Sequence, residues 1–247
     1  MVIANNILLC YNVGVEEMTK MNQKPCKYIK EGAIPEKKFD MNKAPIKQKK
    51  YVLPFLWAFA NIRKWLLLGK INKIGMKGIK PPYILICNHN AFYDFYIMSA
   101  AIAPNTGIFP AAVDDYIGRE RQLRKLGAIP KRKFTADVSM LRNCRWALKE
   151  KLIFGIYAEA KYSLIGETEV IPDAIGQLIK HQKVPVVVLT CRGHHIYDPF
   201  WGNHRHRWVH PVQADMVCAY TPEQLKTASI DEINAKLREL LYNDDFR

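Results

Sequence analysis

Apolar residues recur along the chain beyond residue 80 in two alternating patterns, one typical of buried strands and one typical of helices. Short apolar runs predict strands at 83–87, 106–113, 153–157 and 184–190. Apolar positions at helical spacing predict helices at 94–103, 138–152 and 173–180. Strands that alternate with helices favour an α/β fold with a mixed, mostly parallel central sheet covered by helices.

The end of the chain continues this pattern. A further strand or pair of strands is expected within 207–220. Ser229 and Glu232 form a capping-box pattern, in which each side chain binds a backbone N–H near the start of a helix. We therefore expect a last helix that begins there and runs toward Leu241.

An amphipathic helix is predicted at 51–68, where large apolar side chains recur at helical spacing among basic ones. Two interpretations fit: a helix lying in a membrane interface, or a helix packed onto the domain. No transmembrane span is predicted, because the apolar run 51–60 is far shorter than the roughly 20 residues that cross a bilayer. Residues 1–17 lack the positive start and cleavage site of a signal peptide, so we expect none.

Positive charge is concentrated near the start of the chain. The formal net charge is +14, and residues 20–80 hold sixteen Lys or Arg against three acidic residues. We expect a basic, flexible lead-in at 1–50, an interfacial helix region at 51–79 and one main domain at 80–247. The basic arm suits an anionic membrane, nucleic acid or a solvated tail. No nucleic-acid recognition motif accompanies it, so we expect no nucleic-acid partner.

Cysteines and histidines give little support for a metal or a disulfide framework. The six cysteines contain no C-x-x-C pair, which excludes familiar zinc spacings and fits a reducing cytosol. The histidine-rich segment 194–210, with Asp198 in it, has the side chains to hold a transition metal, but its spacing matches no familiar ligand pattern. We expect no metal there, and an acceptor-side loop or an interfacial surface instead.

The segment Asn88-His89-Asn90-Ala91-Phe92-Tyr93-Asp94 directly follows the strand expected at 83–87. His89 on the turn and Asp94 in the first helical turn could meet, and the helix dipole favours a carboxylate there. Asp94 would then accept from one imidazole nitrogen and leave the other free to take a proton from an alcohol. Taken alone, a His-x4-Asp spacing is common and a structural explanation is the stronger one.

Three later segments strengthen the catalytic interpretation: 126–132 (Leu-Gly-Ala-Ile-Pro-Lys-Arg), 156–163 (Ile-Tyr-Ala-Glu-Ala-Lys-Tyr-Ser) and 184–190 (Val-Pro-Val-Val-Val-Leu-Thr). Together the four blocks resemble the glycerolipid acyltransferase family, specifically the 1-acylglycerol-3-phosphate (lysophosphatidate) acyltransferases, over about residues 80–195. The resemblance implies that His89, oriented by Asp94, acts as general base on an acceptor hydroxyl that attacks an acyl thioester. No cofactor is implied.

The third block carries the main departure from the family pattern. Family members usually read Phe-Pro-Glu-Gly-Thr-Arg-Ser there and use the block to bind the glycerol phosphate. Here Glu159 and Ser163 are kept, Ala158 replaces the proline, and Tyr162 stands where the arginine would be. The block is similar to a bacterial branch that reads Pro-Glu-Ala-Arg-Tyr-Ser, with Lys161 in place of its arginine.

The second block supplies the other expected substrate-binding residues, Gly127 and Arg132. Arg132 is the leading phosphate candidate, since a guanidinium binds phosphate through two hydrogen bonds. The resemblance implies acyl-CoA or acyl-carrier protein as donor, lysophosphatidate as acceptor, and action at the cytoplasmic face of the cell membrane. Two alternatives stay open: a different lysophospholipid or hydroxylated lipid acceptor, and a catalytically weak membrane-binding homologue.

Overall fold

The computed structural model describes residues 41, 43–67, 71–91, 94–132, 138–159, 163, 166–168, 170–197 and 212–242. Most of the expected lead-in at 1–50 lies outside these residues. Its last residues contact the domain: the side chain of Gln48 donates to the carbonyl of Leu126 (2.9 Å) and accepts from the N–H of Gly107 (3.1 Å).

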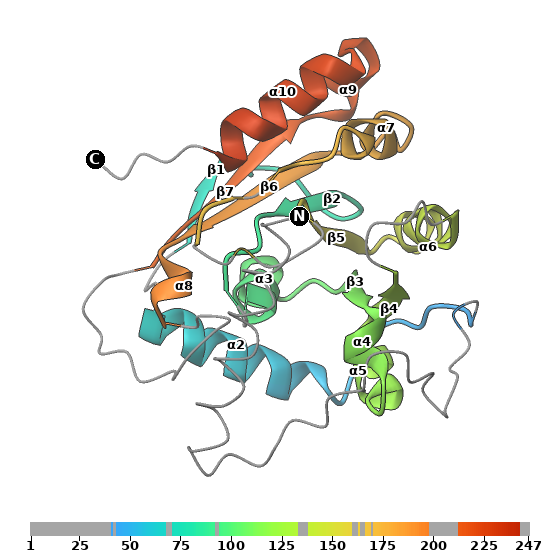
Figure 1. Ribbon diagram of the computed structural model, residues 1–247, viewed down its shortest axis with the longest axis vertical. Coiled ribbons are helices and arrows are strands. Elements are labelled where there is room, and N and C mark those ends of the chain that lie inside the picture. Colours follow the sequence, from blue (N-terminus) through green and yellow to red (C-terminus); the bar gives the residue numbers. More distant parts are fainter. Residues whose placement is uncertain are drawn as a thin grey trace, which may run out of the picture. The chain divides into compact units, whose positions relative to one another are not determined.

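A seven-stranded sheet forms the centre of the domain, with the strand order β1-β7-β6-β2-β5-β3-β4 (Figure 1). Its strands are β1 (Asn72–Ile74), β2 (Ile84–Cys87), β3 (Gly107–Ala112), β4 (Ala128–Lys131), β5 (Ile153–Tyr157), β6 (Val186–Arg192) and β7 (Gln213–Tyr220). Neighbouring strands are parallel except for β6 and β7, which are antiparallel. The prediction of a mixed, mostly parallel sheet is confirmed.

The helices are α2 (Leu53–Leu67), α3 (Asp94–Ile102), α4 (Val113–Tyr116), α5 (Glu120–Lys125), α6 (Val138–Lys149), α7 (Ala174–Lys180), α8 (His194–Tyr197), α9 (Pro222–Thr227) and α10 (Ile230–Leu241). The predicted capping box at the start of α10 is present: Ser229 Oγ accepts from the N–H of Glu232, whose carboxylate accepts from the N–H of Ser229. This reciprocal pair satisfies two backbone donors that the helix itself leaves without a partner.

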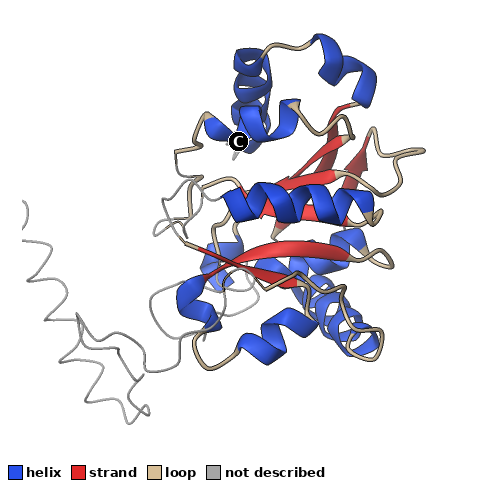
Figure 2. Ribbon diagram, turned by 90° about the vertical axis from the view of Figure 1, so that its right-hand side faces the viewer, coloured by secondary structure: helices blue, strands red, loops and turns tan. Residues whose placement is uncertain are grey.

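Helices cover both faces of the sheet (Figures 1 and 2). Successive side chains of a strand point to opposite faces, and β2 shows the result. Ile84 and Ile86 belong to the apolar cluster that includes residues of α6, α7 and α10. Leu85 and Cys87 belong to the cluster that includes residues of α3. Because β2 is buried on both faces and lies in the middle of the sheet, the loop that leaves it has neighbours on either side.

Helix α2 has one face packed on the domain and one face exposed. Leu53, Leu56 and Ala60 are buried where α2 contacts α3. Phe55 and Trp65 are 78% and 73% exposed. The packing interpretation therefore describes one stripe of the helix, and a membrane interface for the exposed stripe stays a prediction. Within the described part of the chain, no helix combines the length and the apolar character that a membrane span requires.

Candidate active site

His89 and Asp94 meet at the carboxyl edge of the sheet, directly beyond β2. Asp94 is the first residue of α3, and its Oδ2 lies 3.1 Å from Nδ1 of His89. The backbone N–H of Ala91 donates to the same oxygen at 2.9 Å. Asp94 is only 3% exposed and His89 only 8%. The carboxylate is therefore held from two directions, and the imidazole that it contacts is almost entirely buried.

The neighbouring strand β5 supports the backbone of His89. Oε1 of Glu159 accepts from the N–H of His89 at 2.9 Å, and the N–H of Ser163 donates to the carbonyl of His89 at 2.8 Å. The ring of Tyr157 stacks on the imidazole with 3.8 Å between centroids and 9° between planes. Glu159 and Ser163, which the sequence predicts to bind substrate, thus contact the backbone of His89.

The strand on the other side, β6, holds the same loop through the backbone of Cys191. The side-chain amide of Asn88 donates to the carbonyl of Cys191 and accepts from its N–H, both at 2.8 Å. The amide of Asn90 donates to that carbonyl as well, at 2.6 Å. All three residues are buried. His89 therefore lies in a segment whose two flanking side chains are bound to the adjacent strand.

A second histidine contacts the same carboxylate, and sequence reasoning did not assign it to the site. Nδ1 of His194, the first residue of α8, lies 2.6 Å from Oδ1 of Asp94, and its side chain is fully buried. The available signal was positional. His194 follows the end of β6 by two residues, as His89 follows the end of β2 by two residues, and the two strands are parallel neighbours.

Two opposing influences set the ionisation of Asp94. Burial favours its neutral form, whereas the hydrogen bonds and charges of His194 and His89 favour the carboxylate. The histidines dominate and lower the pKa of Asp94 from its ordinary 3.8 to about 2. The carboxylate is therefore ionised at neutral pH, and each of its oxygens can accept an N–H from one of the two histidines.

The other predicted site residues lie next to β4, the strand at one lateral edge of the sheet, or outside the described residues. Arg132 directly follows β4 and is exposed. β4 is three strands from β2, which corresponds to about 14 Å at the usual strand spacing. Gly127 lies in the turn before β4 with φ of +80°, where its N–H donates to the carbonyl of Arg124. Lys161 lies outside the described residues.

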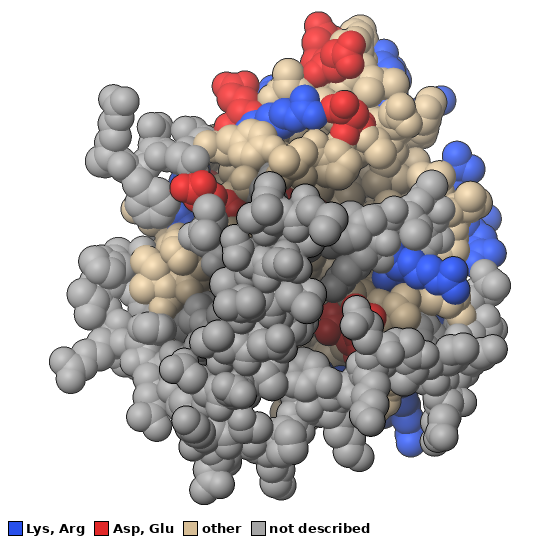
Figure 3. Space-filling view, in the orientation of Figure 1, with Lys and Arg blue, Asp and Glu red and all other residues tan. Residues whose placement is uncertain are grey.

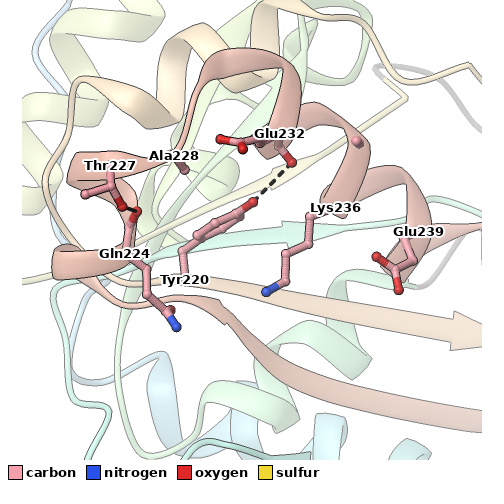
Figure 4. Close-up of a pocket in the computed structure, with 8 residues that line it drawn as sticks. Tyr220, Gln224, Thr227, Ala228, Glu232, Lys236 and Glu239 are labelled. Atoms are coloured by element: carbon pink, nitrogen blue, oxygen red, sulfur yellow. Dashed lines mark hydrogen bonds between the residues drawn. The ribbon is translucent and has the colours of Figure 1, made fainter.

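An open hollow of about 650 Å³ lies elsewhere, where Tyr220 meets α9 and α10 (Figure 4). Tyr220 pairs with Val186 at the start of β6, whereas the histidines lie beyond the ends of β2 and β6. The hollow is therefore at the opposite edge of the sheet and includes none of the predicted site residues. Among the described residues, no cluster of three or more His, Cys, Asp or Glu is arranged to bind a metal; most of the histidine-rich segment lies outside them.

Comparison with known proteins shows a likeness in structure. No protein-family model matches the chain, and no curated protein matches it either. Among solved structures, the chain is similar to the crystal structure of the 1-acyl-sn-glycerophosphate (LPA) acyltransferase PlsC from Thermotoga maritima, with a TM-score of 0.58 and 20% sequence identity over 78% of each chain. The chain therefore has the mixed α/β fold of that acyltransferase.

Proposed function

We propose that this protein is an O-acyltransferase that moves a fatty acyl group from acyl-CoA or acyl-carrier protein to the free hydroxyl of 1-acylglycerol-3-phosphate. The contact between His89 and Asp94 carries the proposal: an ionised, buried carboxylate holds one imidazole nitrogen at the carboxyl edge of the sheet, where α/β proteins place their ligands. The fold that the chain shares with PlsC supports it.

The chemistry follows from the two ring nitrogens of His89. With Nδ1–H donated to Asp94, Nε2 is the atom that accepts the proton of the acceptor hydroxyl. The hydroxyl oxygen attacks the thioester carbonyl carbon, and the carbon–sulfur bond then breaks. The departing thiolate takes the proton from the imidazolium, so the histidine ends the cycle neutral. Asp94 stabilises the imidazolium while it exists.

Substitution of His89 tests the proposal. His89→Asn keeps a nitrogen near the position of Nδ1, and so a donor for Asp94, but removes the base. We expect transfer from acyl-CoA or acyl-carrier protein to lysophosphatidate to fall by about 10²–10⁴-fold. His181→Asn, on an exposed histidine after α7, is the matched control and should be fully active. Undiminished turnover by a folded His89→Asn variant would remove His89 from the chemistry.

We propose that the acceptor is bound by the residues that the family resemblance implies, namely Arg132, Glu159, Lys161, Gly127 and Ser163. If Arg132 binds the acceptor phosphate, Arg132→Ala raises KM for lysophosphatidate and leaves KM for the donor unchanged. Tyr162 in place of the family's arginine favours one second candidate, transfer to another lysophospholipid or hydroxylated lipid. A panel of acceptors with and without a phosphate monoester decides between the two.

We propose that the enzyme works at the cytoplasmic face of the cell membrane, docked through α2. The exposed apolar side chains of this helix support the proposal, and so does Lys64 in its last turn. Elsewhere on the domain, basic side chains lie over the side that carries α6, and acidic ones lie over the end that carries α9 and α10 (Figure 3). Vesicle binding without any acyl transfer would favour the alternative of a catalytically weak membrane-binding homologue.

A further inference from the structure

Asp94 lies between two histidines that come from different strands. Its Oδ2 contacts Nδ1 of His89 at 3.1 Å, and its Oδ1 contacts Nδ1 of His194 at 2.6 Å. The second contact is the shorter one and the more deeply buried, since the side chain of His194 has no exposed surface. A buried imidazole that close to a carboxylate donates its N–H to it.

The fold directs His194 to this position. β6 ends at Arg192, and Gly193 then adopts a φ of +75°, a conformation that side chains with a Cβ seldom take. The chain turns there into α8, so that its first residue lies above the end of β6. The hydrogen bonds of Asn88 to the backbone of Cys191 fix the neighbouring strand at the same level. The approach of His194 to Asp94 is thus set by backbone geometry on both strands.

Both histidines bind the single negative charge of the Asp94 carboxylate. A carboxylate that is stabilised by a donor on Oδ1 is a weaker base at Oδ2, because its negative charge is partly compensated. Its hold on a protonated His89 is weaker for the same reason. Together with the N–H of Ala91 on Oδ2, the donor on Oδ1 stops the carboxylate from turning about its last bond, which keeps Oδ2 directed at His89.

We propose that His194 is a positioning residue for acyl transfer: by binding Oδ1 of Asp94, it holds Oδ2 against His89 and limits how strongly the carboxylate stabilises the protonated base. The proposal rests on the proposed function, with His89 as general base. It assigns a role in the reaction to a residue outside the His-x4-Asp spacing.

Among the described residues, other ionisable groups lie near Asp94 and its two histidines, and none of these groups replaces His194. Cys87 of β2 and Cys191 of β6 lie close to Asp94, but burial raises the pKa of both thiols well above the ordinary value and keeps them neutral. Glu159, which follows β5, accepts from the backbone N–H of His89. His195 of α8 is close enough to Asp94 and His194 for their charges to affect its pKa. Burial lowers this pKa most, and the charge of His194 lowers it further.

Two substitutions separate the positioning role from simple packing. His194→Leu fills similar space without a donor, whereas His194→Asn supplies an amide N–H near the position of Nδ1. The pH dependence of kcat/KM reports the protonation of the free enzyme's base. In His194→Leu we expect its acid limb to move to higher pH by about half a unit or more, and kcat to fall about tenfold or more because His89 is less well directed. In His194→Asn both should return toward the wild type.

The sign is the same whether His194 is neutral or charged in the wild type. Losing a neutral donor leaves Asp94 more basic, and losing an imidazolium removes a positive charge, so either change strengthens proton binding at His89. His195→Asn, on the adjacent residue of α8, is the control and should leave the acid limb in place. A His194→Leu variant with lowered stability but a wild-type pH profile and kcat would overturn the proposal. Should that variant fail to fold, His194→Gln, whose amide occupies the position of Nε2, takes its place.

A second measurement does not depend on turnover. The Cε1–H NMR signal of His89, identified by its loss in His89→Asn, is recorded over a series of pH values in the wild type and in the His194 variants. A higher midpoint in His194→Leu supports the coupling even if no acyl transfer is found, in which case the proposed function alone fails. An unchanged midpoint overturns the coupling whatever the enzyme does.

Discussion

The carboxylate of Glu159 and the backbone of His89 are joined by a hydrogen bond of 2.9 Å, and Glu159 is only 3% exposed. Glu159 follows β5, and His89 follows β2, its parallel neighbour in the sheet. The contact therefore links two sequence blocks that are 70 residues apart. It gives Glu159 a role in placing the proposed base, in addition to any contact with substrate.

Glu159→Ala should lower kcat more than it changes KM for either substrate. The variant leaves the buried N–H of His89 without its acceptor, which costs about 1–3 kcal/mol of stability, and lets the ring shift, which costs about 100-fold in kcat. Glu159→Gln, which keeps an oxygen for that N–H, is the matched control and should retain most of the activity. Steady-state kinetics and urea unfolding measure both effects; a raised acceptor KM with unchanged kcat would instead indicate a substrate contact.

The stability of the folded domain should depend on the ionisation of Asp94. A carboxyl group whose pKa is lowered on folding stabilises the protein above its ordinary pKa, here 3.8, and loses that contribution as the pH falls toward about 2. The shift corresponds to about 2 kcal/mol at neutral pH. We expect the free energy of unfolding to fall between about pH 5 and pH 2, and the slope to be smaller in Asp94→Asn.

Urea unfolding at a series of pH values measures this dependence. Asp231→Asn, on an exposed carboxylate in the first turn of α10, is the control and should keep the wild-type slope between pH 5 and pH 2. Identical slopes for Asp94→Asn and the wild type would show that the histidine contacts do not survive in solution.

Gly127→Ala should destabilise the domain strongly. A Cβ at this position would lie 2.5 Å from the carbonyl oxygen of Gly107 and 2.8 Å from Cγ of Gln48, at a φ of +80°. Gly118→Ala is the matched control, because its φ is +75° but nothing lies within 4 Å of its Cβ. We expect about 1 kcal/mol of lost stability for Gly118→Ala and clearly more for Gly127→Ala, measured by urea unfolding. A stable Gly127→Ala variant with raised acceptor KM would favour the substrate-binding role that the sequence predicts.

The exposed face of α2 should control binding to anionic vesicles. Phe55 and Trp65 are largely exposed, so the double variant Phe55→Ser with Trp65→Ser should keep its stability. Each ring that enters the interface contributes about 1.5–3 kcal/mol, so the variant should bind vesicles at least about 100-fold more weakly in a sedimentation assay. Truncation through Leu68 is less informative, because Leu56 and Ala60 are buried where α2 contacts α3.

Val138→Ser, on α6, is the control for vesicle binding. This residue is an apolar side chain that is 79% exposed on a different helix. Its substitution should leave vesicle affinity unchanged, whereas raised salt should weaken binding of all variants by screening the basic side chains. Undiminished binding of the α2 double variant would place the membrane surface elsewhere on the protein.

Much of the fold follows from periodicity in the sequence, because its central elements are buried on both faces. The predicted strand 153–157 has the bounds of β5, and α10 begins after its predicted capping box. Elements at the sheet edges carry weaker patterns. β1 is three exposed residues, and β4 contains Pro130, which a strand tolerates at an edge. Neither shows an alternation that the sequence alone would reveal.

In the candidate site, too, only the contact between residues close in the sequence could be predicted. The meeting of His89 and Asp94 could be expected because five residues and one strand-to-helix turn connect them. The role of Ser163 as a donor to the carbonyl of His89 could not, since it depends on which strands become neighbours. His194 depends on that as well, and on the turn at Gly193, which no periodic pattern records.

The central position of β2 also has a consequence during synthesis. His89 and Asp94 leave the ribosome early, but Glu159 and Ser163 follow about 70 residues later and His194 a further 30 or so. Domains are made from the N-terminus onward, at about 5–20 residues per second. For several seconds a nascent chain thus contains the histidine–aspartate pair with neither flanking strand to hold it. We therefore expect the proposed activity to appear only after β6 has been made, when both strands that flank β2 can hold the pair.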